Sequence, residues 1–315
     1  RCCQETVSNY GWVIPAISWI RRESMSAVKP RAIFFDWDGT AVYSRKAPAD
    51  AALSAMKPLL AQGIKLVIVS GTTIENIAGG QIETYFTPEE LRHLYLGLGR
   101  GAYNYAFDEE GRPYVFADKL PDREGLLAVH SICFDIHKEL LKKYDFPTDI
   151  VFSRPNYCKI DLMVSNQRGD QLFLQENELV ILKESLRRHG IEGGLAKLLE
   201  ISGMIGASYG IAVAPTCDAK YLEVGLSSKS DNVDTILDKL QREFGILPEE
   251  CSYWGDEYVG IEEGIFGSDS FMITEKSRTG RFFDVSEVPG KRPQEVTVTG
   301  GGVERFLEYL REISI

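Results

Sequence analysis

The sequence predicts an α/β protein in which a doubly wound, Rossmann-like parallel sheet carries an inserted segment of α+β character. Two apolar runs of β-favouring residues, 33–35 and 64–69, are typical of strands buried on both faces. The amphipathic stretch between them, residues 47–62, supplies the helix that joins two parallel strands. After Pro121 the alternation gives way to paired strands and paired helices, which indicates a second structural unit.

The first part of the core carries a local signal for each element. The helix 47–62 has Pro48 in its first turn and is followed by Gly63, and both residues suit those positions. Another helix is expected to begin near Thr73, after the second strand. The next strand, a hairpin turn and its returning strand are expected at residues 94–98, 108–111 and 114–116.

The inserted segment is expected to follow the order αββααββ. Its first helix, residues 123–144, has an apolar stripe that should face inward. This stripe consists of Leu127, Ile132, Ile136 and Leu140. The later elements are expected at residues 150–153, 159–164, 177–189, 195–207, 210–214 and 220–224.

The chain then returns to the core. An amphipathic helix over about residues 231–244 should be capped by Ser230 or Asp231 and end at Gly245. Two further strands and a closing helix are expected at residues 251–254, 271–274 and 302–313.

These elements divide the chain into three parts. The core would comprise residues 25–120 and 226–315, the inserted segment residues 121–225, and an N-terminal appendage residues 1–24. The apolar stretch at 12–20 within the appendage is shorter than the roughly 20 residues that cross a bilayer. We therefore expect no membrane anchor.

Composition excludes several classes of function. The formal net charge of -11 argues against nucleic acid or an anionic membrane as a partner, because both favour a basic face. The cysteines form no C-x-x-C pair and have no histidine cluster near them, which favours reduced thiols in a cytoplasmic protein over disulfides or a zinc site. They are Cys2, Cys3, Cys133, Cys158, Cys217 and Cys251.

Two carboxylates follow the first strand directly. Asp36 and Asp38 lie two residues apart, so in extended chain their side chains leave the same face. They would repel each other unless a cation or a shared proton lies between them, which indicates a metal or acid/base site. An EF-hand loop is excluded, because Gly39 and Ala47 occupy loop positions 4 and 12, where that motif needs its glycine at position 6 and a glutamate at 12.

Four stretches together resemble the motifs of the haloacid dehalogenase (HAD) superfamily, most of whose members are Mg²⁺-dependent phosphatases. Residues 31–40, R-A-I-F-F-D-W-D-G-T, are similar to motif I, D-x-D-x-T. Ser70, after the second strand, resembles motif II, and Lys229 in V-G-L-S-S-K-S resembles motif III. Asp256 in G-D-E resembles motif IV. The position of the inserted segment, between motifs II and III, resembles a C2-type cap of Cof-type sugar phosphatases.

The resemblance implies a role for each motif residue. Asp36 would be the nucleophile and a Mg²⁺ ligand, and Asp38 the general acid/base, with its backbone carbonyl also on the ion. Asp256 would be the third Mg²⁺ ligand. The phosphoryl oxygens would be held by Ser70, the Gly71 amide and Lys229, a combination that also suits an anion cradle at the end of a strand. Thr40 would support the loop or cap its turn.

The sequence departs from the Cof pattern in two places. Arg100 stands where the segment before the cap usually has asparagine, and Val259 and Gly260 replace the N-D pair of G-D-x-x-N-D. The support for the metal at motif IV is therefore open among the nearby glutamates, with Glu257 as the candidate and Glu262 and Glu263 as alternatives.

Polar residues on the first hairpin of the inserted segment could contact the leaving group of a substrate, or could form a solvated turn. They are Arg154, Asn156 and Lys159. The function expected from the resemblance is hydrolysis of a small phosphorylated metabolite, such as a sugar phosphate, with Mg²⁺ as cofactor. The alternatives are a phosphomutase or other phosphotransferase of the same fold and a non-catalytic binding protein.

Overall fold

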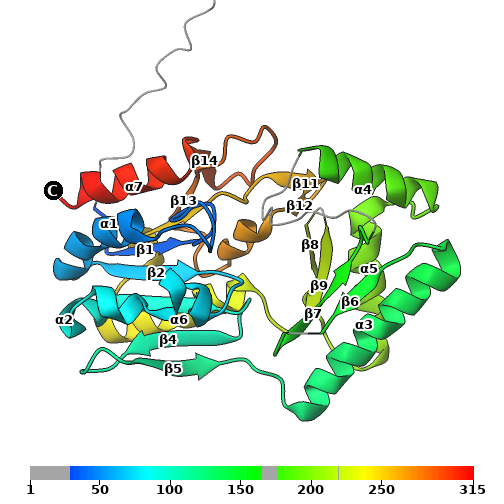
Figure 1. The fold of residues 1–315 in the computed structure, drawn as a ribbon, viewed down its shortest axis with the longest axis horizontal. Helices are drawn as coiled ribbons and strands as arrows, with labels where there is room; N and C mark the ends of the chain where they lie inside the picture. Colours follow the sequence, from blue (N-terminus) through cyan, green and yellow to red (C-terminus); the bar gives the residue numbers. More distant parts are fainter. Residues whose placement is uncertain (1–28, 153, 165–175, 219) are drawn as a thin grey trace, which may run out of the picture.

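The computed structural model describes residues 29–152, 154–164, 176–218 and 220–315. The appendage expected at residues 1–24, with Cys2 and Cys3, lies outside the described residues. The described chain forms an eight-stranded sheet in the core and a separate four-stranded sheet in the inserted segment, which lies at the right of Figure 1. No helix within these ranges is long and apolar enough to cross a membrane.

The large sheet has the strand order β14-β13-β10-β1-β2-β3-β4-β5. All neighbouring strands from β14 to β3 run parallel, whereas β4 and β5 add an antiparallel edge. The strands are β1 (Ala32–Phe35), β2 (Lys65–Val69), β3 (Leu94–Leu98), β4 (Tyr103–Phe107), β5 (Pro113–Asp118), β10 (Cys251–Gly255), β13 (Arg281–Asp284) and β14 (Val296–Val298). The predicted α/β class and parallel core sheet are confirmed. Because β1 lies between β10 and β2, the residues that follow these three strands meet at one edge of the sheet.

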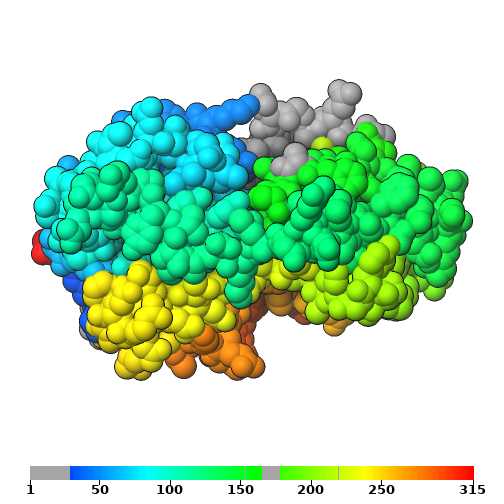
Figure 2. All heavy atoms as spheres, turned by 90° about the horizontal axis from the view of Figure 1, so that it is seen from below, coloured from blue at the N-terminus to red at the C-terminus, as the bar shows by residue number. Residues whose placement is uncertain are grey.

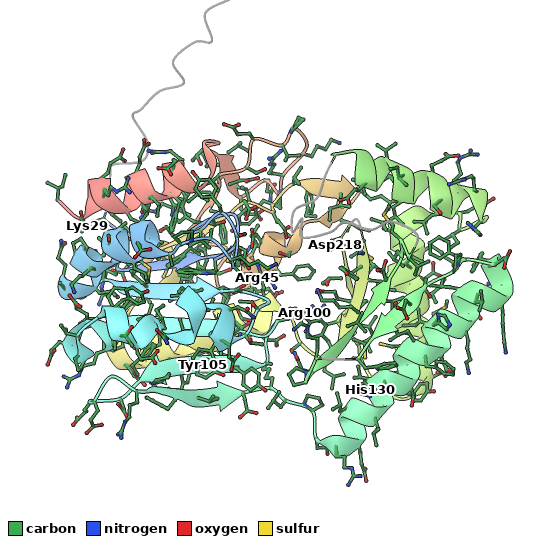
Figure 3. The ribbon with its side chains drawn as sticks, in the orientation of Figure 1. Lys29, Arg45, Arg100, Tyr105, His130 and Asp218 are labelled. Atoms are coloured by element: carbon green, nitrogen blue, oxygen red, sulfur yellow. The ribbon has the colours of Figure 1, made fainter. Side chains whose placement is uncertain are left out.

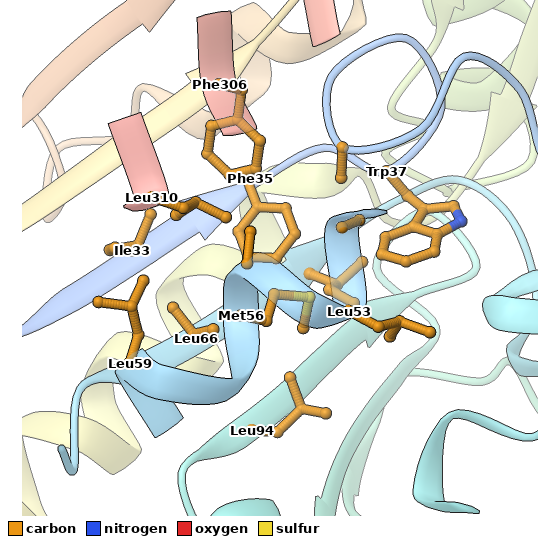
Figure 4. Close-up of a cluster of buried hydrophobic side chains, with 14 of the residues drawn as sticks. Ile33, Phe35, Trp37, Leu53, Met56, Leu59, Leu66, Leu94, Phe306 and Leu310 are labelled. Carbon is orange, nitrogen blue, oxygen red and sulfur yellow. The ribbon is translucent and has the colours of Figure 1, made fainter. Parts of the chain in front are cut away.

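Helices cover both faces of this sheet. On one face, α1 (Asp50–Ala61) and α7 (Gly302–Ile313) pack on Ile33 and Phe35, and the Phe35 and Phe306 rings lie 5.0 Å apart (Figure 4). On the other face, α6 (Lys229–Phe244) packs on Phe34. The short helix α2 (Pro88–Leu91) precedes β3. Since consecutive residues of β1 enter two different cores, the strand is buried on both faces, as its apolar run predicts.

The inserted segment is a four-stranded antiparallel sheet with three helices, in the predicted order αββααββ. Its elements are α3 (Arg123–Tyr144), β6 (Asp149–Val151), β7 (Tyr157–Asp161), α4 (Glu176–Arg188), α5 (Gly194–Ser208), β8 (Thr216–Cys217) and β9 (Tyr221–Gly225). Cys158 and Leu222 belong to the core that the sheet forms with these helices, whereas Lys159 and Glu223 lie on the opposite face. Figure 2 shows this segment and the core as two lobes, with the surface hollowed between them at the lower edge of the view, beside the orange part of the core.

Two expectations for the inserted segment are wrong. Leu127 is 56% exposed, because it lies nine positions before the buried Ile136, which places it on the opposite side of the helix at roughly 100° per residue. The strand expected at 210–214 does not form. Gly210 takes a positive φ of 71°, and Pro215 can donate no hydrogen bond. The Ala214 N–H donates to the Gly225 carbonyl at 2.8 Å, but a strand forms only at Thr216–Cys217.

Three expectations for the core are also corrected. No α-helix begins near Thr73. Three short 3₁₀ turns follow instead, at Ile74–Asn76, Ala78–Gly80 and Ile82–Tyr85, since Gly79 and Gly80 have positive φ. The cap of α6 is Ser228, whose hydroxyl accepts the Ser230 N–H. The strand expected at 271–274 overlaps a 3₁₀ turn, Ser268–Met272, in which local hydrogen bonds occupy the backbone.

A small hairpin interrupts the core between β10 and this turn. It consists of β11 (Gly260–Glu262) and β12 (Ile265–Phe266), which pair antiparallel with each other and with no strand of the large sheet. We call residues 257–269 the β11–β12 hairpin. In Figure 1 it lies beside α4 of the inserted segment.

Candidate active site

Parallel pairing places the ends of β1, β2 and β10 side by side. Phe35 of β1 is in register with Ile68 of β2 and Trp254 of β10, and the Asp36 N–H donates to the Trp254 carbonyl over 3.0 Å. The next residues of the three strands include Asp36, Ser70 and Asp256. The register of the sheet thus brings together three of the residues expected to form the site.

Three carboxylates converge at this edge. One oxygen from each of Asp36, Asp256 and Asp269 lies within 4.8 Å of the other two. Lys229 reaches two of them, since its Nζ lies 2.8 Å from Asp36 Oδ1 and 2.7 Å from Asp269 Oδ1. Asp36, Asp269 and Lys229 are all buried. We call Asp36, Asp256 and Asp269 the acidic cluster.

Asp269 was not among the residues expected from the sequence. It returns to Asp256 because the β11–β12 hairpin closes at its base, where the Asp269 N–H donates to the Glu257 carbonyl. Its Oδ2 then accepts the N–H groups of Asp256 at 3.0 Å and Glu257 at 2.8 Å. The signal in the sequence is the turn Glu262-Glu263-Gly264 between two short apolar stretches, which is typical of a hairpin but does not show that Asp269 returns to Asp256.

The loop after β1 fits closely against Asp256. Gly39 has a φ of +88°, and a Cβ at this position would collide with the Asp256 carboxylate. The Thr40 hydroxyl donates to Asp256 Oδ1 over 3.1 Å. Glycine is required here both for its backbone conformation and for the space that the carboxylate occupies. Thr40 therefore ties the first motif to the fourth.

Asp38 lies beside the acidic cluster with its carboxylate directed elsewhere. It forms an ion pair with Arg45 at 3.3 Å, and Figure 3 shows Arg45 between the core and the inserted segment. Burial raises the pKa of Asp38, against the opposing effects of Arg45 and Lys229. A raised pKa favours the protonated form of the carboxyl group, which is the form that an acid catalyst needs.

Ser70 and Gly71 follow β2 at the same edge. Ser70 is buried, and its Oγ accepts the Thr72 N–H at 3.3 Å. Gly71 is exposed, and a Cβ there would meet no atom within 4 Å. Lys229 is the first residue of α6, so it projects from a helix N-terminus toward the acidic cluster. The arrangement leaves room for an anion beside Gly71.

The charges within the cluster favour binding of a cation. Burial raises the pKa of Asp36, Lys229 opposes this effect, and Asp269 adds to it. Burial also raises the pKa of Asp256, and Asp269 raises it further. Three close carboxylates with one lysine carry excess negative charge, and oxygen ligands of this kind suit Mg²⁺. The residues present thus fit a divalent cation.

The other candidates lie around this centre. Glu257 is outside the acidic cluster and accepts a hydrogen bond from the Ser268 hydroxyl at 2.8 Å. Asn156 is buried and donates to the Gly99 carbonyl at 2.8 Å, and Lys159 pairs with Glu223 at 2.6 Å. Arg154 is half-buried, and its Nε has no hydrogen-bond partner among the described residues.

Arg100 connects the core to the inserted segment. Its guanidinium donates to the Ser227 carbonyl at 2.7 Å and the Ala214 carbonyl at 2.6 Å, and it pairs with Glu223 at 3.2 Å. Figure 3 shows Arg100, with Asp218, in the region between the two parts. Glu223 is therefore held by two cations, Lys159 and Arg100, on the face of the small sheet that lies opposite its helices.

Comparison with solved structures identifies the fold. Plasmodium falciparum IMP-nucleotidase, truncated at its N-terminus and bound to IMP, aligns with a TM-score of 0.54 and 13% identity, over 90% of this chain and 68% of that one. A second structure of the N-terminally truncated enzyme aligns with a TM-score of 0.52 and 15% identity, over 90% of this chain and 70% of that one. The chain shares the fold of these nucleotidase structures, and this is the fold that the resemblance to the HAD superfamily predicts. No protein-family model and no curated protein matches the sequence.

Proposed function

We propose that the protein is a Mg²⁺-dependent phosphatase that hydrolyses a small phosphorylated metabolite through an aspartyl-phosphate on Asp36. The observation that carries this proposal is the acidic cluster, which lies at the ends of parallel strands with Lys229 against Asp36 and Asp269. In a HAD-type fold this is the position of chemistry on phosphate esters, and the residues gathered here would provide the groups that such chemistry needs.

The acidic cluster would hold the ion through Asp36, Asp256 and Asp269, with the backbone carbonyl of Asp38 as a further candidate ligand. When bound, Mg²⁺ supplies positive charge that offsets the charge developing on the phosphoryl oxygens. Glu257 would support the site from outside the cluster. A cation here also favours the ionised form of Asp36, against the effect of burial, so that its oxygen can act as a nucleophile.

In the first half-reaction an oxygen of Asp36 forms a bond to phosphorus while the bond from phosphorus to the leaving oxygen breaks. Asp38 donates its proton to that oxygen, which leaves as an alcohol. In the second half-reaction Asp38 takes a proton from water as the water oxygen attacks phosphorus, and the bond to Asp36 breaks. Phosphate is released, the carboxylate of Asp36 is restored, and Asp38 is protonated again.

Three groups would hold the phosphoryl oxygens during these steps. Lys229 carries a buried positive charge, and its pKa is raised above the ordinary value because Asp269 and Asp36 outweigh the effect of burial. The Ser70 hydroxyl and the Gly71 amide lie at the neighbouring strand end and would donate hydrogen bonds.

The inserted segment would act as a cap that chooses the leaving group. Its polar face carries Lys159 and Glu223, and Arg154 has an unpartnered Nε, so the substrate would have a polar leaving group such as a sugar. The NH₂ group of Asn156 donates to the Gly99 carbonyl, whereas its Oδ1 has no hydrogen-bond partner among the described residues, so Asn156 would contact a substrate only as an acceptor. The similarity to IMP-nucleotidase makes a nucleoside monophosphate the second candidate.

A phosphate-release screen tests the proposal. Purified protein is assayed against sugar phosphates, nucleoside monophosphates and p-nitrophenyl phosphate, with Mg²⁺ and with EDTA, beside the Asp36→Asn variant. We expect release that requires Mg²⁺ and disappears in the variant while circular dichroism is unchanged. Conversion of one sugar phosphate to its isomer without phosphate release would identify a phosphomutase. Absence of both reactions would indicate a binding protein.

A further inference from the structure

The β11–β12 hairpin joins the acidic cluster to the inserted segment. At its base, Asp256 and Asp269 stand on either side of it, and the Gly267 N–H donates to the Val259 carbonyl at 3.0 Å. The base is tightly packed, because a Cβ on Gly267 would collide with the Glu257 carbonyl. The hairpin thus sets how close the two carboxylates come.

The far end of the hairpin is embedded in the other lobe. Ile261 is 4% exposed and belongs to the hydrophobic core of the inserted segment, against which Ile265 also packs. The Ile261 carbonyl accepts a hydrogen bond of 2.7 Å from Lys183 of α4. A residue of the core polypeptide therefore completes the packing of the inserted segment.

Glu262 makes a specific polar contact at the same place. Helix α5 begins after Gly193, which has no side chain to cap it. Glu262 Oε2 instead accepts the Leu195 N–H at 2.8 Å, and its carboxylate lies against Gly194, where a Cβ would leave it no room. The acid satisfies a free N–H and lies at the positive end of the helix.

We propose that Ile261 and Glu262 are positioning residues through which the hairpin couples the placement of the inserted segment to the geometry of the acidic cluster. The functional consequence of this coupling is that closure over a substrate and binding of a cation strengthen each other. That consequence rests on the proposed function. Movement of the inserted segment pulls on the tip of the hairpin, and the strain reaches the base, where Asp269 accepts the N–H groups of Asp256 and Glu257. By thermodynamic reciprocity, a bound cation also holds the inserted segment in place.

Two measurements on the full chain without substrate test this coupling. The affinity for Mn²⁺ is measured by electron paramagnetic resonance. The mobility of the inserted segment relative to the core is measured as the rate of protease cleavage in the two connecting segments near residues 120 and 226, with and without Mn²⁺. The variants are Glu262→Ala and Ile261→Ala. Glu263→Ala is the matched control. Glu263 is exposed, is next in the chain and lies outside the acidic cluster, so it does not take the metal-supporting position considered for it, and its loss changes the net charge equally.

We expect Glu262→Ala to weaken Mn²⁺ binding by roughly fivefold or more, the lower range of coupling between distant sites, and to speed cleavage. Glu262→Gln should restore part of both effects, since its carbonyl can still accept the Leu195 N–H. Glu263→Ala should change neither. Faster cleavage at unchanged Mn²⁺ affinity would mean that the hairpin only holds the inserted segment and does not affect the cation site. Equal effects of Glu262→Ala and Glu263→Ala would mean that the change in net charge causes them. Either result overturns the proposal.

Ile261→Ala tests the apolar half of the contact and should act in the same direction. If that variant does not fold, Glu262→Ala decides alone, because it removes no buried apolar surface. The proposed function fails separately: a wild-type protein that hydrolyses no phosphate ester would still give interpretable Mn²⁺ affinities and cleavage rates.

Discussion

Lys229 donates a hydrogen bond of 2.7 Å to Asp269, although the two residues stand 40 positions apart and on different elements. Asp269 is fully buried and Lys229 nearly so. The same ammonium group reaches Asp36 at 2.8 Å. One cation therefore neutralises part of a site that holds three carboxylates, and this arrangement makes the stability of the fold depend on Lys229.

Replacement of this lysine should destabilise the protein strongly. In Lys229→Met both Asp36 and Asp269 lose their partner while still buried, and loss of one member of a buried ion pair costs about 3–5 kcal/mol. Urea unfolding measures the change. The exposed pair Lys276–Asp238 provides the control, since Lys276→Met should cost less than about 1 kcal/mol. Mg²⁺ should restore part of the stability of Lys229→Met. Equal losses in the two variants would contradict the central position of Lys229.

Gly39 gives a sharper test of the cation site. Gly39→Ala adds a methyl group where the Asp256 carboxylate lies, in addition to the strain at a φ of +88°. Gly245→Ala isolates the strain, because Gly245 has a φ of +61° with no atom near its Cβ position. Both variants should lose about 1 kcal/mol of stability through the backbone. Only Gly39→Ala should also lose Mg²⁺ affinity, as measured by calorimetry; retained affinity would place the ion away from Asp256.

The central part of this site could be predicted from sequence because each residue follows an element with a strong local signal. Asp36 and Asp256 end apolar strands, and Lys229 begins an amphipathic helix. Parallel pairing then brings the strand ends together without further information. The same holds for the sheet and for the order of elements in the inserted segment.

Other features depend on contacts that no local pattern encodes. Asp269 lies at the base of a hairpin whose closure is stabilised by the inserted segment, so its partner Asp256 is set by tertiary structure. The exposure of Leu127, by contrast, follows from the helical period alone, since it lies on the opposite side of α3 from Ile136. The turns that replace the helix expected near Thr73 also have a local cause, namely the positive φ angles of Gly79 and Gly80.

Asp38 should matter according to the leaving group. An acid is needed when the departing oxygen is a poor leaving group such as a sugar hydroxyl, and is dispensable for p-nitrophenolate. Asp38→Ala should therefore slow release of the sugar by roughly 10²–10⁴-fold and release of p-nitrophenolate only slightly. Single-turnover rates of leaving-group release from both substrates measure this, because the second half-reaction, in which Asp38 would take a proton from water, is common to both. Asp38→Asn is the control for size, since it fills the same space without a transferable proton. Equal effects on both substrates would exclude proton donation by Asp38.

The stability of the metal-free protein should depend on pH in an unusual direction. Burial raises the pKa of Asp36 to about 8, against Lys229, from a value of 3.8 in the absence of such surroundings. Between these values the folded protein retains a proton that the unfolded chain has released, so the free energy of unfolding falls as pH rises, by up to about 1.4 kcal/mol per pH unit for one proton. Well below pH 3.8 both states are protonated and the contribution of this group is constant.

Urea unfolding in EDTA between pH 5 and pH 8 measures this slope, with Asp36→Asn as the matched variant that has no proton to lose. We expect the wild type to lose stability relative to the variant as pH rises. Mg²⁺ replaces the proton at the acidic cluster, so its stabilising effect should grow over the same range and flatten the curve of the wild type. A difference between wild type and variant that is independent of pH would mean that Asp36 is ionised throughout. In that case Lys229 alone would stabilise the buried carboxylate of Asp36, and no cation would be required to keep this nucleophile ionised.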